Sequence, residues 1–312
     1  MTDLVVGADI GGTSTRVGVS DTAGTVLAVA AGGPGNPNTV GIEGSAAQIR
    51  SVIDRALGST EGRVLAVVIG LAGGSRTVAV PGFLRAAMPD RVDALAQLVG
   101  DPTVAFCSAT PARRGYVLVA GTGAIAGEVV GDDLVQQRDG WGWLLGDEGS
   151  GFWMGRAAVR ATLAALQRAE ALGPLHEAVL DTSDTRDYVE LLQASYAATP
   201  TWLAQFSALV SAHAADDPVA AGIAAEAVSL LERLFLSLDP EPELPVVLGG
   251  SVLTKPGPVS AALRERLAAR PGAEVLTSSS GVIGALWIAL RRHVAESTDA
   301  HDRLVASAAP WL

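Results

Sequence analysis

The sequence predicts an α/β protein made of two related lobes, and two observations carry this prediction. The first is an internal repeat: residues 4–32 and 116–140 each read as an apolar strand, a Gly/Thr-rich loop, a second strand, an acidic turn and a third strand. The second is that a helix-like stretch and a further strand follow the first copy, as in an α/β unit. Two such units suggest lobes that face each other across a cleft, each supplying one Gly/Thr loop. The alternative is a chance similarity of two glycine-rich hairpins.

Hydrophobic periodicity and helix breakers predict the remaining elements in order. They are a loop at 32–41, a helix over 45–57, a strand over 63–74, a short helix around 93–98, a strand over 96–100, a mostly helical segment at 155–238, a β-branched strand that breaks at Gly249 and Gly250, and a helix at 281–297. The loop at 32–41 follows from Pro34 and Pro37, which remove backbone donors, and from its glycines.

Composition and charge exclude several classes of function. A chain of 312 residues with 49% hydrophobic residues is long enough for two domains with sizeable cores. Its net charge of −11 gives no general attraction to nucleic acid or anionic membranes. The single cysteine, Cys107, allows no internal disulfide, and the first residues lack the basic segment of a signal peptide. We therefore expect a cytoplasmic protein with neither a nucleic acid nor a membrane as partner.

The two Gly/Thr loops are typical of phosphate binding without a lysine. Lys255 is the only lysine in the chain, so phosphate must be held by backbone N–H groups, hydroxyls, arginine or a metal ion. The residues expected to bind phosphate are Gly11, Gly12, Thr13, Thr15, Gly121 and Thr122. Asp9, at the base of the first loop, is the expected magnesium ligand, because Mg²⁺ is commonly held by one or two carboxylates plus substrate phosphates. An ordinary glycine-rich turn capped by Asp9 is the alternative.

Seven motifs in a fixed order resemble one family. They are "DIGGTST" (9–15), "GGPGNPNTVG" (32–41), "VVIGLAGG" (67–74), "VGD" (99–101), "AGTGAIA" (120–126), "DGWGWLLGDEGSGFWMGRAAV" (139–159) and "VVLGGSV" (246–252). Together they resemble the N-acetylglucosamine kinase branch of the sugar kinase, Hsp70 and actin superfamily. That branch also includes the activator ATPases of 2-hydroxyacyl-CoA dehydratases and benzoyl-CoA reductases.

The resemblance implies a fold and an activity. The fold is α/β, with two ribonuclease-H-like lobes around an ATP and sugar cleft. The N-terminal lobe would be residues 1–115 plus about 287–312, and the C-terminal lobe 116–286 with a helical insertion. The activity would be ATP- and Mg²⁺-dependent phosphorylation of an amino sugar, foremost N-acetylglucosamine to its 6-phosphate, by a homodimer. Glucosamine or a related hexosamine is the alternative substrate.

Asp101 is the candidate catalytic base. It reads as the N-cap of a helix that starts at Pro102, at the carboxyl end of a strand, where open α/β sheets bind ligands. By the resemblance, its carboxylate would accept the proton of a sugar hydroxyl during phosphoryl transfer. Asp101 could instead be only a helix cap. Asp93 is the rival base, but it sits inside a helical pattern.

The resemblance also implies substrate contacts. The residues expected at the sugar are Asn36, Trp141, Asp147, Glu148 and Gly123, and those expected at the adenine are Gly249, Gly250 and Ser251. Aromatic rings stack on pyranose faces, and carboxylates accept hydrogen bonds from hydroxyls. We expect Trp143 and Trp153 to pack in the core, and Ser150 to cap the helix after them.

Two other functions stay open at this point. An activator ATPase shares the phosphate motifs but needs cysteines for an iron–sulfur cluster, and Cys107 alone does not supply them. A non-catalytic sugar sensor would normally add a helix-turn-helix and a basic surface, whereas this chain is acidic. The chain departs from many relatives at Ala124 and Ile125, which removes polar groups near the second loop and puts the acyl-group specificity in doubt.

Overall fold

The chain folds into two compact units in a computed structural model that describes residues 2–58, 60–71, 73, 80–293 and 298–311. Unit 1 is Met1–Gly115, Val129–Val135 and Ser278–Leu312, and unit 2 is Tyr116–Glu128 and Gln136–Thr277. The predicted α/β fold class with two related lobes is confirmed. The expected domain limits stay a prediction; the compact units group residues 129–135 and 278–286 with the N-terminal residues.

Unit 1 contains a five-stranded sheet of order β3-β2-β1-β4-β5. Its strands are β1 (Asp3–Ile10), β2 (Thr15–Asp21), β3 (Val26–Gly32), β4 (Arg63–Leu71) and β5 (Leu95–Gly100). Its helices are α1 (Pro37–Leu57), α2 (Val80–Ala87), α3 (Asp101–Ala109), α11 (Gly281–Leu290), α12 (Thr298–Ala308) and the 3₁₀ helix η2 (Ala309–Trp311). The first three strands form an antiparallel meander, and β4 and β5 run parallel to β1.

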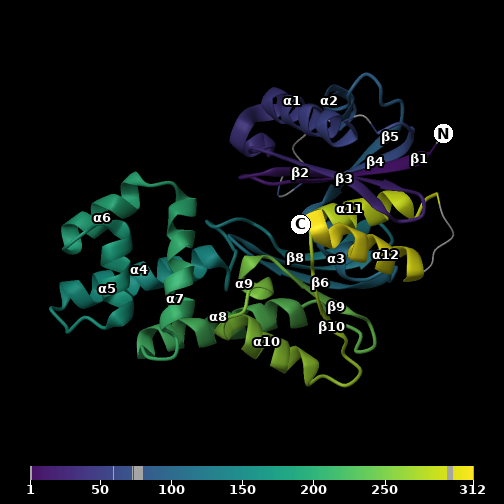
Figure 1. The fold of residues 1–312 in the computed structure, drawn as a ribbon. Helices are drawn as coiled ribbons and strands as arrows, with labels where there is room; N and C mark the ends of the chain where they lie inside the picture. Colours follow the sequence, from purple (N-terminus) through teal and green to yellow (C-terminus); the bar gives the residue numbers. More distant parts are fainter. Residues whose placement is uncertain (1, 59, 72, 74–79, 294–297, 312) are drawn as a thin grey trace. The chain divides into compact units, whose positions relative to one another are not determined.

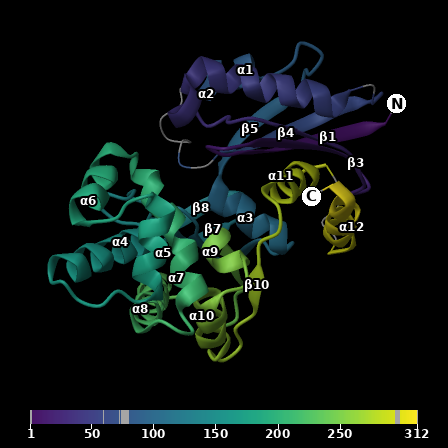
Figure 2. The same ribbon diagram turned by 60° about the vertical axis from the view of Figure 1, so that its left-hand side comes forward.

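Helices cover both faces of the unit 1 sheet (Figures 1 and 2). Alternate residues of β1, from Leu4 to Ile10, belong to the core shared with α1 and α2, as the two-residue period of a strand requires. The opposite face packs on α11 so closely that a Cβ at Gly7 would lie 2.4 Å from the backbone nitrogen of Leu286. Glycine at this position therefore lets a helix lie directly on the sheet.

Unit 2 contains the second five-stranded sheet, of order β10-β9-β6-β7-β8. Its strands are β6 (Arg114–Ala120), β7 (Ala124–Val130), β8 (Asp133–Asp139), β9 (Val246–Gly249) and β10 (Val275–Thr277). Its helices are α4 (Gly151–Gln167), α5 (Pro174–Ser183), α6 (Tyr188–Ala197), η1 (Pro200–Phe206), α7 (Ser207–His213), α8 (Pro218–Leu236), α9 (Ser251–Thr254) and α10 (Pro258–Ala268). The turn between β7 and β8 belongs to unit 1.

The internal repeat predicted from the sequence is present in the two sheets. In each sheet the first strand of the meander lies between the second strand and a later strand that runs parallel to it, β4 in one and β9 in the other. In each, a further parallel strand closes the edge. The repeat therefore puts one Gly/Thr loop at the equivalent strand connection of each unit.

Several local predictions were wrong. The stretch around 93–98 forms no helix; β5 starts at Leu95, and Asp93 precedes it as an exposed residue. The expected loop at 32–41 already becomes helical at Pro37, with an interruption at Gly41, where φ is 74°. The strand expected over 63–74 ends at Leu71; Ala72 and residues 74–79 lie outside the described residues.

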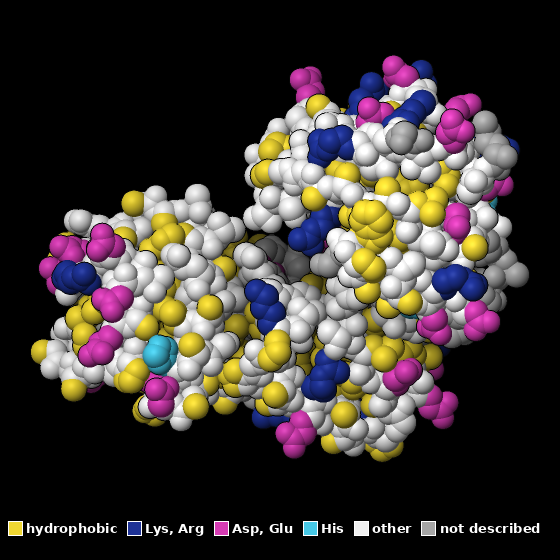
Figure 3. Space-filling view, viewed as in Figure 1, with side chains coloured by type: hydrophobic (Ala, Val, Ile, Leu, Met, Phe, Trp, Pro, Cys, Tyr) yellow, Lys and Arg dark blue, Asp and Glu magenta, His cyan; other side chains and the backbone are white. Residues whose placement is uncertain are grey.

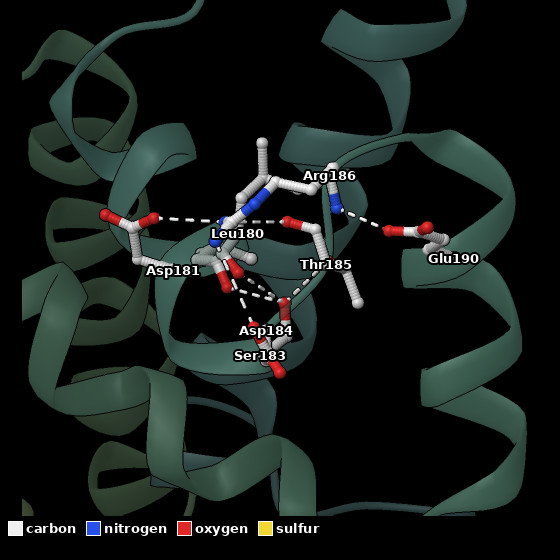
Figure 4. A network of polar contacts seen from close by, with 8 residues as sticks. Leu180, Asp181, Ser183, Asp184, Thr185, Arg186 and Glu190 are labelled. Atoms are coloured by element: carbon white, nitrogen blue, oxygen red, sulfur yellow. Dashed lines mark hydrogen bonds and ion pairs between the residues drawn. The ribbon is translucent and has the colours of Figure 1, made fainter.

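The helical segment of unit 2 is confirmed, and its turns are fixed by local polar contacts (Figure 4). At the turn between α5 and α6, Glu190 accepts a hydrogen bond of 2.7 Å from the backbone N–H of Arg186. The guanidinium of Arg186 donates to Asp181 at 3.3 Å. Both partners of this ion pair are largely exposed, so the ion pair contributes little to stability.

Asp217 joins two helices through one buried carboxylate. It is 2% exposed and caps α8 by accepting hydrogen bonds from Val219 and Ala220, at 2.8 and 3.0 Å. Its second oxygen accepts from the N–H of Leu175 in α5 at 2.9 Å. Burial raises the pKa of Asp217, but these three N–H donors outweigh it and hold the pKa below its ordinary value.

Asp217→Ala is expected to lower the free energy of unfolding by about 2 to 4 kcal/mol, because a cap is lost and a buried N–H is left unpaired. The control is Asp187→Ala, an exposed cap of α6, which should cost about 1 kcal/mol. A group with a lowered folded-state pKa stabilises above its unfolded pKa, about 3.9, and loses this effect as pH falls through the folded value. Urea unfolding at pH 7 and pH 3 measures the loss of unfolding free energy relative to the parent, and for Asp217→Ala this loss should be smaller at pH 3. An equal loss for Asp217→Ala and Asp187→Ala would contradict the double cap.

The surface carries interspersed charges and no membrane-spanning helix within the described residues. On the face in view, acidic and basic side chains are scattered over both units (Figure 3). Of the helices in the described part of the chain, none combines the length and apolar character that a membrane span needs.

Candidate active site

Two carboxylates of unit 1 lie at the same edge of its sheet. Asp9 is the last residue but one of β1 and is paired with Gly70 of β4, which is in turn paired with Val99 of β5. Asp101 comes two residues after Val99, where β5 passes into α3. Because β1, β4 and β5 are parallel, both residues stand at the carboxyl ends of their strands, and β1 and β5 lie two strand spacings, roughly 10 Å, apart across the sheet. Open α/β sheets bind ligands at this edge.

Asp101 has the electrostatic character of a base that titrates near neutral pH. Burial raises its pKa to about 6, hydrogen bonds from the N–H groups of Gly73 and of Asp101 itself lower it, and the charge of Asp9 raises it. The helix cap was predicted one position too late: Gly100 is the N-cap of α3 and Asp101 its first residue. Its carboxylate accepts the N–H of Asp101 itself, in the first turn of α3, so a local structural role stands beside the expected catalytic one.

Asp9 packs against the first residue of α11. A Cβ at Gly281 would lie 2.4 Å from Cγ of Asp9 and 2.5 Å from its Oδ2, so a larger residue there would displace the carboxylate. Burial raises the pKa of Asp9, and the positive charge of Arg16 lowers it. Gly281 was missed because it is far from Asp9 in the sequence; its only signal is a glycine at the start of an expected helix.

The donor set around Asp9 fits magnesium better than a transition metal. Within the described residues, no three His, Cys, Asp or Glu side chains gather as a metal cage. A cage is not required for Mg²⁺, which keeps several waters and is held by one or two carboxylates plus substrate phosphates. Asp9 supplies the one carboxylate that this mode of binding needs.

The first Gly/Thr loop is pinned to the start of α1. The N–H groups of Gly35 and Asn36 both donate to the carbonyl of Gly11 at 3.2 Å, and Gly11 donates to Ser14 at 2.9 Å. Gly12 and Thr13 are exposed, as a phosphate-binding backbone requires. Thr15 is fully buried, and a Cβ at Gly35 would lie 2.2 Å from its hydroxyl. The expected contact of Thr15 with phosphate stays a prediction, and the burial of Thr15 does not support it.

Thr39 is a further hydroxyl beside this loop that the sequence reading missed. It is exposed on the first turn of α1, and a Cβ at Gly12 would lie 3.4 Å from its Oγ1. Because residues 32–41 were expected to be a loop, no local pattern placed Thr39 against Gly12.

Asn36 is the N-cap of α1. Its side-chain oxygen accepts a hydrogen bond from the N–H of Asn38 at 2.9 Å, and the residue is 7% exposed. Asn36 thus has a local structural role that the sequence reading did not assign to it. The expected sugar contact stays a prediction, and any test of it must separate the cap from the amide group.

The second Gly/Thr loop is held by the N-terminus of α4. Gly151 donates to the carbonyl of Gly121 at 2.7 Å, and Phe152 donates to that of Thr122 at 3.1 Å. These bonds satisfy two N–H groups of the first helical turn, and Ser150 caps α4 by accepting from Trp153 at 3.2 Å, as predicted. The loop carbonyls therefore point to α4.

Asp147 holds the second Gly/Thr loop through a hydrogen bond to its backbone. It is 8% exposed with φ of 60°, and its Oδ1 accepts from the N–H of Ala124 at 2.9 Å. A Cβ at Gly123 would lie 2.7 Å from the same oxygen. Burial raises the pKa of Asp147, the Ala124 N–H lowers it, and Asp139 raises it. One carboxylate oxygen is thus committed to the loop, and the expected sugar contact falls to the other.

Asp139 closes the loop that carries the aromatic residues. Its Oδ1 accepts from the N–H groups of Trp141 and Asp147, at 3.2 and 3.1 Å. Trp141 is 70% exposed, in agreement with a ligand-facing role that stays a prediction. Trp143 remains 44% exposed although its ring lies 5.7 Å from that of Phe152, so its expected burial is only partial.

Glu148 and Trp153 lie on either side of the start of α4. Trp153 packs against the core of unit 2, as expected. Glu148 is exposed and lines a surface hollow with Arg156 and Arg160 of α4. Its expected contact with a sugar hydroxyl stays a prediction.

The strand β9 ends in a turn that only glycine can form. Gly250 has φ of 80°, and a Cβ there would lie 2.3 Å from the carbonyl oxygen of Ala120. The strand breaks at these glycines, as the sequence predicted: Gly249 ends β9, and Ser251 starts the short helix α9. This turn lies directly against the second Gly/Thr loop.

Comparison with known proteins identifies relatives of this arrangement. An N-acetyl-D-glucosamine kinase from Dictyostelium discoideum is 30% identical over 203 residues, which are 61% of this chain and 64% of that kinase, less than two thirds of its length. An N-acetylmuramic acid/N-acetylglucosamine kinase from Clostridium acetobutylicum is 28% identical over 242 residues, 75% of this chain and 78% of that kinase.

A solved structure that is similar to this chain carries the same kinase name as both sequence relatives. A candidate N-acetylglucosamine kinase from Chromobacterium violaceum has 28% identity and a TM-score of 0.76, over 91% of this chain and 98% of that chain. The profile of the BadF/BadG/BcrA/BcrD ATPase family matches residues 6–289. The resemblance read from the seven motifs is thus confirmed, and this chain belongs to the BadF/BadG/BcrA/BcrD ATPase family.

Proposed function

We propose that this protein phosphorylates an amino sugar with ATP, with N-acetylglucosamine as the foremost substrate and its 6-phosphate as the product. The observation that carries the proposal is the pair Asp9 and Asp101 at one strand edge beside an exposed Gly/Thr loop. Two relatives named as N-acetylglucosamine kinases support the substrate class. We also propose a cytoplasmic homodimer, on the resemblance to this branch.

Each residue in the proposed mechanism has a task that follows from its surroundings. Asp101, with a pKa of about 6, is mostly ionised at pH 7 and accepts the proton of the attacking sugar hydroxyl. The backbone N–H groups of Gly12 and Thr13 orient phosphate oxygens, a role for which the exposed loop is suited. Asp9 would hold magnesium, which neutralises phosphate charge when bound.

The proposal is tested by screening amino sugars with ATP and Mg²⁺ and measuring ADP release. N-acetylglucosamine or glucosamine should give sugar-dependent ADP release, and NMR of the product should place the phosphate on O6. ADP release that needs no sugar would favour the activator ATPase alternative. Binding of sugar without turnover would favour the sensor.

The substrate preference is expected to depend on Asn36. Asn36→Ala should lower kcat/KM for N-acetylglucosamine, costing about 1 to 3 kcal/mol, and lower it less for glucose, because a site built to hydrogen-bond a group penalises its absence. Steady-state kinetics on both sugars measures this difference.

Two controls separate recognition from helix capping. Asn36→Ser keeps an N-cap acceptor but loses the amide, so it should lose the sugar preference while keeping the thermal stability of the parent. Asn38→Ala removes an exposed side chain. Because Asn38 bonds to Asn36 through its backbone N–H, this variant should change neither the sugar preference nor the thermal stability. Equal losses on the two sugars, or a parent that prefers glucose, would show that the specificity lies elsewhere.

A further inference from the structure

A fully buried arginine follows helix α11. Arg291 comes directly after Leu290, the last residue of α11, and none of its side chain is exposed. Its Nη2 donates to the carbonyl of Gly131 at 2.6 Å and forms an ion pair with Asp132. Its Nε and Nη1 have no hydrogen-bond partner among the described residues. A buried charge is costly unless it is paired, so the guanidinium of Arg291 depends on Asp132.

Asp132 lies in the turn between β7 and β8 and pairs with two arginines. One of its oxygens contacts Arg291, and the other contacts Arg292, which is partly exposed. Burial raises the pKa of Asp132, but the hydrogen bonds and charges of both arginines hold it below its ordinary value. The same turn is held by the N–H of Gly131, which donates to the carbonyl of Arg113 at 2.7 Å. Asp132, Arg291 and Arg292 therefore form a hairpin clasp, which ties the β7–β8 turn to the end of α11.

Helix α11 joins the hairpin clasp to the candidate metal ligand. Its first residue, Gly281, packs against the carboxylate of Asp9, and its ten residues span about 15 Å. Between these ends α11 packs on α3 (Figures 1 and 2), so closely that a Cβ at Gly284 would overlap the carbonyl oxygen of Val104. A helix packed this closely moves as a rigid element, so a shift at the clasp is carried to Asp9.

Strand β7 joins the hairpin clasp to the second Gly/Thr loop. It runs from Ala124, which follows Gly123 of that loop, to Val130, which precedes the clasped turn. In its sheet β7 lies between β6 and β8, and the N–H of Ala124 is held by Asp147. A strand paired on both edges is a rigid element too, so a shift at the clasp is also carried to the loop.

We infer that Asp132 and Arg291 are positioning residues that link Asp9 to the second Gly/Thr loop, so that metal and nucleotide strengthen each other's binding. The inference rests on the proposed kinase function and on the expected binding of phosphate by Gly121 and Thr122. A metal that bridges Asp9 and a phosphate adds to nucleotide affinity only where both are held in the right geometry. Such coupling is reciprocal, so each ligand raises the affinity of the other by the same factor. The hairpin clasp is the step of this path that depends on a charge, and a substitution of Asp132 removes that charge.

The test measures how much a divalent metal strengthens nucleotide binding. Calorimetry gives the Kd of a non-hydrolysable ATP analogue in excess chelator and in saturating Mn²⁺, and the ratio of the two Kd values is the metal gain. Asp132→Asn should lower the metal gain by about three- to thirtyfold and change the Kd in chelator by less than about twofold. Asp132→Glu keeps the charge and should retain most of the metal gain. Asp133→Asn, at the exposed neighbouring carboxylate, should leave the metal gain unchanged.

A merely structural role of the hairpin clasp gives a different result. Thermal unfolding of the same variants measures stability, and an Asp132→Asn variant that melts at a lower temperature but keeps the metal gain of the parent would overturn the inference. If Asp132→Asn does not fold, Arg292→Ala decides in its place, because it removes only the partly exposed member of the clasp. Its metal gain should fall by at least about twofold, and an unchanged metal gain would again contradict the inference.

A double-mutant cycle tests the path along α11. Gly281→Ala displaces Asp9 at the other end of the helix. Adding Asp132→Asn to Gly281→Ala should lower the metal gain by less than about a further twofold, because both changes break one path, whereas losses that multiply would exclude a path through α11. Sugar-dependent ADP release by the parent, together with an unchanged metal gain in Asp132→Asn, would overturn this inference alone. A parent that neither binds the nucleotide nor releases ADP with any amino sugar would overturn the proposed function as well.

Discussion

Asp101→Asn should lower kcat by roughly 10² or more, with KM for the sugar much less affected. The variant keeps the size of the side chain but cannot accept a proton, and general-base catalysis contributes about 10² to 10⁴ in rate. Helix α3 should tolerate the change, because Gly100 and not Asp101 is its N-cap. Steady-state kinetics with saturating ATP measures the effect, and circular dichroism shows that the fold is kept.

The pH dependence of kcat/KM provides a second test of Asp101 as the base. Protonation of Asp101 removes the base, so kcat/KM of the parent should fall about tenfold per pH unit below the pKa of about 6, while the residual activity of Asp101→Asn should lack this limb. Asp93→Asn, the rival base before β5, is the matched control and should resemble the parent, since Asp93 is exposed. Turnover of Asp101→Asn within threefold of the parent, or a limb that survives in it, would show that another group is the base.

The parts of the fold that follow local rules were predictable from the sequence. Strands of the repeated meander alternate or run apolar, and each ends in a glycine-rich loop, so both sheets could be expected from residues 4–32 and 116–140. Ser150 was recognised as a cap because a hydroxyl residue preceded a helical pattern. These features depend on neighbours within a few positions.

The wrong local predictions have separate physical causes. Residues 93–98 contain Ala, Leu and Gln, which favour helix, but pairing with β4 makes Leu95–Gly100 an edge strand whose first residue is 90% exposed. In the loop at 32–41, Pro37 was counted as a breaker although proline is favoured at the first helical position after an Asn cap. That second error could have been avoided from sequence alone.

The contacts that shape the candidate site were beyond local reasoning. Gly281 meets Asp9, and Asp147 accepts the N–H of Ala124, because residues far apart in the sequence come together in the fold. A glycine required by a close approach looks like any other glycine until the partner is known. For this reason the motif residues could be named in advance, but the residues that position them could not.

Asp9→Asn should abolish most of the activity and raise the magnesium concentration needed for half-maximal rate. An amide carries no charge, so the variant should hold Mg²⁺–ATP less well, and we expect kcat to fall by 10² or more, as for loss of charge stabilisation in phosphoryl transfer. Gly281→Ala tests the same carboxylate without removing it, because the added Cβ would overlap Asp9 and displace it.

Both variants should therefore show the same magnesium dependence, whereas Asp3→Asn, an exposed carboxylate at the opposite end of β1, should not. Binding of Mn²⁺ with a non-hydrolysable ATP analogue, followed by electron paramagnetic resonance, measures the affinity without turnover. It should weaken in Asp9→Asn and Gly281→Ala alone. Full activity of the parent in excess chelator, or unchanged Mn²⁺ affinity in Asp9→Asn, would remove Asp9 from the metal site and leave the exposed backbone of Gly12 and Thr13 as the main phosphate contact of unit 1.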